Sequence, residues 1–230
     1  MGVKLAAMAV LLLAVSVSSR AWEVVHQEER LTVSRRDYAG SGLDEIKGVL
    51  RLQASLNAVM ALLKDAPFNR HWVYRSGGAQ LLEEVGYEQA YVYGVVDAPF
   101  PMSDRDTVVR FDYRQDPATK AIVIDITNVP DYIPENPGLV RVPEMGGYWA
   151  LRPEAGGWVE VSYQIHGDRG GWIPVWVANQ AAVLSVSNTL RNMAQVVERY
   201  AQARSPFVQE VGSPADAPLH VTDDGDEVAD

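Results

Sequence analysis

The sequence contains no cysteine among its 230 residues. This absence excludes disulfide bonds, a thiol nucleophile and any metal site built on cysteine. Histidine is also scarce, and no two of the four histidines are three or four residues apart. A zinc-binding helix face is therefore not expected, and the sequence predicts no metal and no other cofactor. The histidines are His26, His71, His166 and His220.

Basic residues are outnumbered by acidic ones, 20 to 30, which gives a formal net charge of −10. General nucleic-acid binding requires a basic surface, so the composition argues against that class of function. The hydrophobic fraction of 47% is sufficient for a sizeable core, and the length favours one domain.

Catalytic motifs are few. The chain has no P-loop, no dinucleotide-binding fingerprint and no G-x-S-x-G elbow. Asp106 could serve as a base and Arg105 as an anion anchor, but a run of charges also suits an ion-pair cluster at a strand entrance. His166 with Asp168 could form an acid–base pair, although the glycines around Asp168 favour a turn. No catalytic residue is assigned from these patterns.

The one long apolar run lies at the N-terminus, from Leu5 to Val17. Lys4 precedes it and Ser19-Arg20-Ala21 follows, which is the order of a cleaved signal peptide. We expect cleavage after Ala21 and export to the periplasm or the medium, with an uncleaved anchor as the alternative. Residues 205–230 are acidic, and we expect them to form a disordered tail. The folded domain is then predicted to span residues 22–204.

Strands are predicted over much of the chain by alternation of apolar and polar residues. Short pieces occur at 22–25, 30–33 and 47–53, and the clearest alternation lies between residues 79 and 166. Such strands form an antiparallel sheet with one face in water and one face covered. The residues expected to face inward are Val109, Phe111, Tyr113, Ile124, Val161, Tyr163 and Ile165.

Two helices are predicted among these strands. Ser55 has the character of an N-cap, and Pro67 ends the short helix that follows. Residues 174–200 contain no proline after Pro174 and predict a helix on the order of 40 Å long. Its apolar residues recur in steps of three and four, which is one helical face. They are Val183, Val186, Leu190, Met193, Val197 and Tyr200. An α+β fold follows, in which a curved sheet packs around the last helix.

Three stretches resemble one family, the START lipid-transfer domains. Residues 98–109, APFPMSDRDTVV, resemble the family pattern P-F-P-x-S-x-R-D-x-V. Residues 138–153, GLVRVPEMGGYWALRP, are similar to its V-R-x-x-x-x-x-G-x-W strand, which here contains Arg141 and Trp149. Residues 170–179, GGWIPVWVAN, are similar to the start of its last helix. The resemblance implies the helix-grip fold, in which the sheet and the helix enclose a tunnel for one lipid.

The resemblance also implies a function and some ligand contacts. The expected role is to carry one hydrophobic ligand, a phospholipid or another membrane lipid, through the periplasm. Arg70 and Trp72 resemble a pair in the phosphatidylcholine-binding member, in which an arginine shortly before a tryptophan holds the phosphate. Phe111 stands where several sterol carriers have a cavity-side basic residue, and Arg110 falls on the other face, so a sterol ligand is disfavoured. The alternative is a cyclase or hydrolase of the same superfamily.

The entrance is expected where the proline-rich loop 128–138 meets the start of the last helix. Tyr132, Ile133 and Trp176 would then touch a bilayer transiently, since aromatic and aliphatic side chains suit that interface. Trp176 and Val183 are expected to contact the ligand from the helix. The alternative is that these residues only pack the loop against the helix. A monomer is expected.

Overall fold

The computed structural model describes residues 21–168, 170–171 and 173–212. These residues form one long sheet, two α-helices and two short 3-10 helices. The elements in chain order are β1 (Glu23–Gln27), β2 (Leu31–Asp37), β3 (Asp44–Gln53), α1 (Leu56–Lys64), η1 (Ala66–His71), β4 (Ser76–Val85), β5 (Gln89–Val96), β6 (Arg105–Gln115), β7 (Ile122–Asn128), β8 (Val140–Arg141), β9 (Glu144–Glu154), β10 (Trp158–Asp168), α2 (Val175–Val196) and η2 (Val197–Tyr200).

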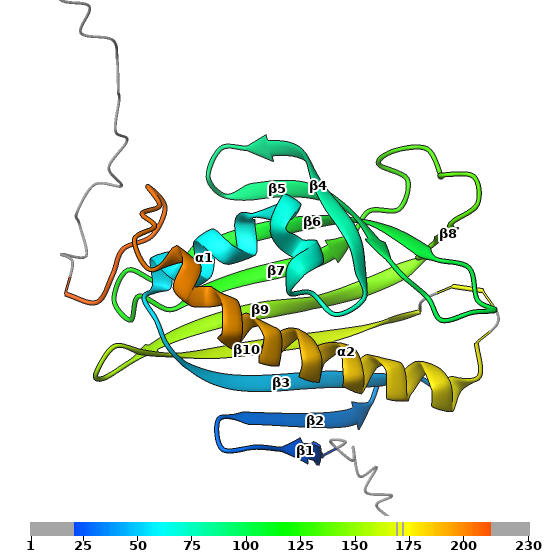
Figure 1. Ribbon diagram of the computed structural model, residues 1–230, viewed down its shortest axis with the longest axis horizontal. Helices are drawn as coiled ribbons and strands as arrows, with labels where there is room; N and C mark the ends of the chain where they lie inside the picture. The colour runs from blue at the N-terminus through cyan, green and yellow to red at the C-terminus, as the bar shows by residue number, and fades with distance from the viewer. Residues whose placement is uncertain (1–20, 169, 172, 213–230) are drawn as a thin grey trace, which may run out of the picture.

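The sheet runs in the order β1-β2-β3-β10-β9-β7-β6-β5-β4, and β8 adds a short parallel pairing to β6. All other pairings are antiparallel. The sheet curves around α2, and α1 lies over the same face near the C-terminal end of α2 (Figure 1). This is the expected α+β helix-grip architecture, and the sheet is not closed into a barrel.

The predicted apolar face of the last helix packs onto the sheet. Val186, Leu190 and Met193 have no exposed surface. Close approach depends on Gly48 of β3, because a Cβ atom there would lie 2.3 Å from Leu190 Cδ1 and 2.7 Å from Val186 Cγ1. The absence of a side chain at Gly48 therefore lets α2 settle onto β3.

Hydrogen bonds tie α2 to two separate segments of the fold. Near its start, Asn179 Oδ1 accepts the backbone N–H of Asp44 on β3 at 2.9 Å. Further along, Thr189 Oγ1 accepts the N–H of Tyr74, and Asn192 Nδ2 donates to the carbonyl oxygen of Trp72. The helix is thus anchored to β3 on one side and to the segment between η1 and β4 on the other.

The chain after the last helix is packed rather than free as far as Glu210, which corrects the expected start of the tail at residue 205. Phe207 is buried, with its ring 6.3 Å from that of Tyr113. The Glu210 carboxylate accepts the N–H groups of Leu56 and Asn57 at the start of α1, where negative charge stabilises a helix. Residues 213–230 and the expected signal peptide up to residue 20 lie outside the described residues.

The loop between β7 and β8 is ordered and lies against the outer face of the sheet. Tyr132 stacks on Tyr91 of β5 with ring centroids 4.3 Å apart, and its hydroxyl hydrogen-bonds to Glu83 of β4. Arg141 donates to the carbonyl oxygen of Ile133 at 3.1 Å and to that of Pro134 at 3.2 Å. The loop is therefore held against strands β4–β6 from outside. Across the described ranges, no helix is both long and apolar enough to span a bilayer.

Candidate functional site

The inner face of the sheet carries the strand residues that were predicted to face inward and to contact a ligand. Strand register puts Phe111 opposite Ile126, Tyr113 opposite Ile124, and Val161 opposite Leu50, all on the side that faces α1 and α2. All seven residues predicted to face inward belong to, or pack against, the hydrophobic core. The predicted orientation is therefore confirmed, while their contact with a ligand stays a prediction.

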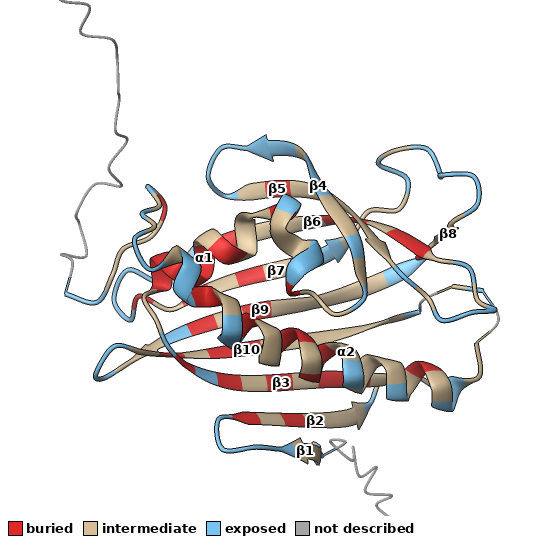
Figure 2. Ribbon diagram, in the orientation of Figure 1, coloured by how far each residue is buried: buried red, intermediate tan, exposed pale blue. Residues whose placement is uncertain are grey.

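One end of this inner face is closed by packing. On β10, Val159 and Val161 are buried. Ile122 of β7 and Leu151 of β9 have no exposed surface, and Met60 of α1, also fully buried, belongs to the same hydrophobic cluster. Figure 2 shows this end, beneath α1 and the C-terminal half of α2, largely in the colour of buried residues. The closed end is a conventional core.

The other end of the same face is not fully packed. On β10, Tyr163 and Ile165 are only partly buried, although they continue the inward series of Val159 and Val161. On β6, Phe111 is also partly buried. Further inner-facing residues with the same partial burial are Val92, Gly94, Thr107, Met145 and Val183. This open end lies toward the β5–β6 loop and the start of α2 (Figure 1).

Small side chains keep the open end spacious. Strand register places Ala79, Gly94 and Thr107 in one row across β4, β5 and β6. A Cβ atom at Gly94 would meet only Thr107 Oγ1, at 3.8 Å, which is an ordinary contact. The apolar pattern does not predict these three positions, because small residues do not stand out in it. The alternation of Ala90, Val92, Gly94 and Val96 is the signal that could have revealed them.

Three aromatic residues line the boundary between the two ends. Trp149 of β9 stacks on Tyr163 of β10 with ring centroids 3.9 Å apart. Trp72 lies 6.4 Å from Trp149, and its indole Nε1 is buried without a hydrogen-bond partner among the described residues. Trp72 and Trp149 thus occupy the interior, as the resemblance implied. Arg70 does not, because its side chain is exposed on η1.

Two arginines near the open end lie on opposite faces of the sheet. Arg105 of β6 shares the inner side with Thr107 and Val109, as alternation requires. Arg141 lies on the outer face, where its guanidinium makes two hydrogen bonds with the fully buried Asp106 carboxylate, at 2.9 and 3.0 Å. This hydrogen bonding raises the pKa of Arg141. The expected contact of Arg141 with a ligand inside is therefore wrong, since Arg141 secures the outer loop.

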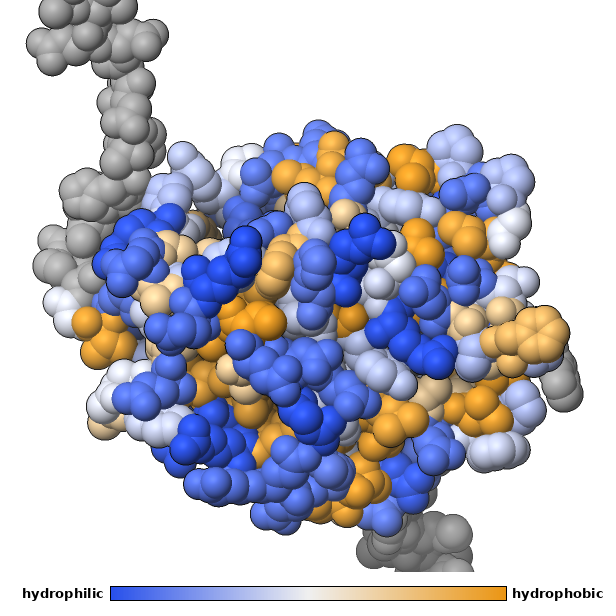
Figure 3. Space-filling view, viewed as in Figure 1, coloured by the Kyte–Doolittle hydropathy of each residue, from blue (hydrophilic) through white to orange (hydrophobic). Residues whose placement is uncertain are grey.

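Exposed apolar side chains surround the open end. Phe100 in the β5–β6 loop is 96% exposed, and Trp176 at the start of α2 is 70% exposed. Val175, beside Trp176, is also exposed. Figure 3 shows hydrophobic surface at this end of the molecule, on the side that carries α2. The β5–β6 loop and the start of α2 therefore both expose an aromatic residue at this end. The expected position of Tyr132 there is wrong, because that ring stacks on the outer face.

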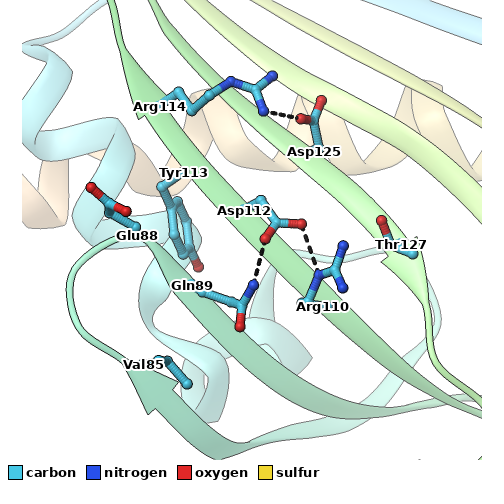
Figure 4. Close-up of a pocket in the computed structure, with 9 residues that line it drawn as sticks. All are labelled: Val85, Glu88, Gln89, Arg110, Asp112, Tyr113, Arg114, Asp125 and Thr127. Carbon is cyan, nitrogen blue, oxygen red and sulfur yellow. Dashed lines mark hydrogen bonds and ion pairs between the residues drawn. The ribbon is translucent and has the colours of Figure 1, made fainter.

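The outer face of the sheet has an open hollow of about 680 Å³ beside β6 and β7. Figure 4 shows two ion pairs in it, Arg110 with Asp112 and Arg114 with Asp125, together with the carboxylate of Glu88. Burial raises the pKa of Asp112, but the hydrogen bonds from Gln89 and Arg110 and the charges of the nearby arginines outweigh burial, so the pKa is lowered overall. The paired charges neutralise one another, so the hollow presents a polar surface rather than a lipid site.

The candidate catalytic groups do not assemble on the inner face. His166 lies on the outer side of β10, stacked on Tyr38 with ring centroids 4.0 Å apart. Asp168 instead accepts the N–H of Gly170 in the turn before α2. Asp106 is committed to Arg141. On the inner face, burial and then the charge of Glu84 raise the pKa of Tyr113 far above its usual value, so its hydroxyl stays protonated. Within the described ranges no three metal-ligating side chains form a group.

Known proteins of similar sequence and structure support the helix-grip fold. The START domain family matches residues 2–203. A crystal structure of a STAR-related lipid transfer protein fragment from Xanthomonas axonopodis is 36% identical and superposes with a TM-score of 0.72, covering 77% of this chain and 98% of that one.

Two further relatives come from sequence comparison. An uncharacterized protein of Pseudomonas aeruginosa is 30% identical over 178 residues, which is 77% of this chain and 87% of the relative. Phosphatidylcholine transfer protein of Bos taurus is 28% identical over 190 residues, covering 80% of this chain and 88% of its own. With a family match that spans most of the chain and a helix-grip fold to accompany it, this protein belongs to the START domain family of lipid-binding proteins.

Proposed function

We propose that this protein carries one membrane lipid, a phospholipid or a similar amphiphile, with its acyl chains against the open end of the inner face. The observation that carries this proposal is the partial burial of an apolar surface that faces inward. Tyr163, Ile165 and Phe111 are oriented like core residues but are not packed like them. Flexible acyl chains are suited to covering such a surface.

The physical reason for a carrier is the cost of exposing lipid chains to water, which is about 0.8 kcal/mol for each CH₂ group. An apolar interior removes that cost during transfer. Two of the relatives described above are named for lipid transfer, and one of them for phosphatidylcholine. These names support lipid as the ligand class.

The proposed entrance lies between the β5–β6 loop and the start of α2. Phe100 and Trp176 expose their rings at that end, where they would insert at the boundary between headgroups and acyl chains. Gly170 and Gly171, both with a φ near 70°, form the turn that leads into α2. Contact with the membrane is transient in this scheme, because a carrier must leave with its load.

We propose that the protein carries its lipid through the periplasm. The support is the order of residues 1–21, in which one basic residue, an apolar run and a small-x-small site follow one another. N-terminal sequencing of the exported protein is expected to find Trp22 as its first residue. A chain that begins at Met1 in the membrane fraction would contradict export by cleavage.

Lipid loading tests the function. The purified protein is mixed with phospholipid vesicles, re-isolated and weighed by native mass spectrometry, where a mass increase of one lipid per chain is expected. Thr107→Trp would fill the spacious row on the inner face and should abolish loading. Thr127→Trp is the matched control, because Thr127 is exposed on the outer face of β7 and should load normally.

The outcome that contradicts a carrier is equally clear. A correctly folded wild-type protein that gains no lipid mass from any vesicle composition would refute the proposal. Equal loading by the Thr107→Trp and wild-type proteins would place the lipid elsewhere on the chain. Circular dichroism and thermal unfolding of each variant establish that the fold is intact before loading is compared.

A further inference from the structure

Arg105 is a buried cation that has no counter-charge among the residues the structure describes. Its side chain belongs to a residue that is only 7% exposed, and Nε is buried without any hydrogen-bond partner. Within the described ranges, the guanidinium donates one hydrogen bond, from Nη1 to the carbonyl oxygen of Ser103. Among the residues that the structure describes, no carboxylate pairs with it.

Such an arrangement is costly unless an anion completes it. Removing a charge from water costs several kcal/mol, which is why buried charges in proteins are normally paired. The neighbouring Arg141 follows that rule, with the Asp106 carboxylate and three loop carbonyl groups around it. The fold therefore supplies a full set of partners to one of two adjacent buried arginines and leaves the other incomplete.

The position of Arg105 points to the missing partner. It is the first residue of β6, directly after the loop that carries Phe100, and it faces the inner side of the sheet. Its Nη2 atom lies 3.7 Å from where a Cβ atom at Gly171 would be, just before α2. The next inner row contains Gly94 and Thr107, where the structure leaves room.

We infer that Arg105 binds the anionic headgroup oxygens of the carried lipid, a phosphate or a carboxylate, at the entrance. The acyl chains then extend from Arg105 past Thr107 toward Phe111 and Ile165. A guanidinium can donate two parallel hydrogen bonds to such a group, and the unpaired Nε with Nη2 forms one of its donor edges. This inference rests on the proposed carrier function and adds that the headgroup of the ligand contains a phosphate or a carboxylate group.

Three lipids with identical acyl chains separate the headgroup from the tail. Phosphatidic acid and phosphatidylcholine carry phosphate, whereas diacylglycerol does not. Each is offered to the wild-type protein in the same neutral vesicles, and loading is measured by native mass spectrometry. For the wild-type protein, we expect loading with the two phosphate lipids to exceed loading with diacylglycerol by tenfold or more. This comparison does not depend on any variant.

Substitution then assigns the preference to Arg105. Arg105→Gln should reduce the preference to about twofold or less, while Arg105→Lys, which keeps the charge, should retain part of it. The matched control is Arg110→Gln on the outer face of the same strand, which should keep the wild-type preference. Because Arg105 has no counter-ion to lose, Arg105→Gln should unfold at the wild-type temperature or above.

Three results would overturn the inference in distinguishable ways. Equal loading of diacylglycerol and the phosphate lipids by the wild-type protein would leave the carrier intact and remove the headgroup contact. A thermal shift with inorganic phosphate that requires Arg105, without any lipid preference, would make the site one for a soluble anion. Failure to load any lipid would refute the carrier function and this inference together.

Discussion

The two ends of the inner face have the same sequence pattern and different packing. At the closed end, Val159 and Val161 are buried beneath α1 and α2. At the open end, Tyr163 and Ile165 continue the same alternation on the same strand, yet remain partly exposed. Period-two alternation therefore tells which way a side chain points, but not whether another side chain meets it there.

The two ends differ in the side chains that lie opposite the strands. α1, Phe207 and the C-terminal half of α2 supply apolar side chains to the closed end. The open end faces a row of small residues, Ala79, Gly94 and Thr107, and an exposed helix start. Since side chains in a true core are packed to crystal-like density, the partly exposed residues of the open end do not form a complete core.

The largest difference in stability is expected between substitutions of two isoleucines, one at each end. Ile122→Ala at the closed end should lower the free energy of unfolding by about 2–5 kcal/mol, because a fully buried side chain leaves a cavity. Ile165→Ala at the open end should cost less than half as much in lipid-free protein. Urea denaturation of both variants measures the difference. Equal losses would show that the two ends are packed alike and would end the comparison.

A second pair of substitutions adds one methyl group at each kind of position. Gly48→Ala should destabilise the protein by about 1–3 kcal/mol, since the new Cβ atom would overlap Leu190 and Val186. Gly94→Ala should change stability by roughly 0.5 kcal/mol or less, because its surroundings are open. Thermal unfolding provides the measurement. A large loss at Gly94 would mean that the open end has no spare volume.

The smallest effect on stability is expected at the exposed rings. Phe100→Ser and Trp176→Ser should each change the free energy of unfolding by about 0.5 kcal/mol or less, as surface substitutions do. Both should weaken vesicle binding in a flotation assay, because they remove the apolar groups that would enter the bilayer. Val211→Ser, at another exposed apolar residue, is the control. Unaltered flotation of both variants would place the membrane contact elsewhere.

Much of the fold could be predicted from local patterns. The apolar face of the last helix, the N-cap at Ser55 and the inward side of β6 follow from the helix and strand periods that the backbone imposes. These features depend on residues close together in sequence. They are the part of the structure that a pattern in one sequence can specify.

The remainder depends on contacts between distant segments. The sequence predicts both Arg105 and Arg141 as ligand contacts. In the structure, the loop after β7 covers the outer face, where Arg141 binds a carbonyl group of this loop and the Asp106 carboxylate. Phe207 lies in an acidic stretch typical of disorder, yet it fills a place beside Tyr113. Neither outcome is encoded in a local period, so neither could be predicted from it.

In the proposed carrier, an acyl chain of the lipid lies against the open end of the inner face. A phospholipid with a diazirine at the end of one acyl chain reports this position. After loading and irradiation, peptide mass spectrometry should locate the label on strands β6 and β10, at Phe111, Tyr163 or Ile165. Labelling confined to the outer-face hollow of Arg110 and Arg114, or spread over the exposed surface, would contradict the account.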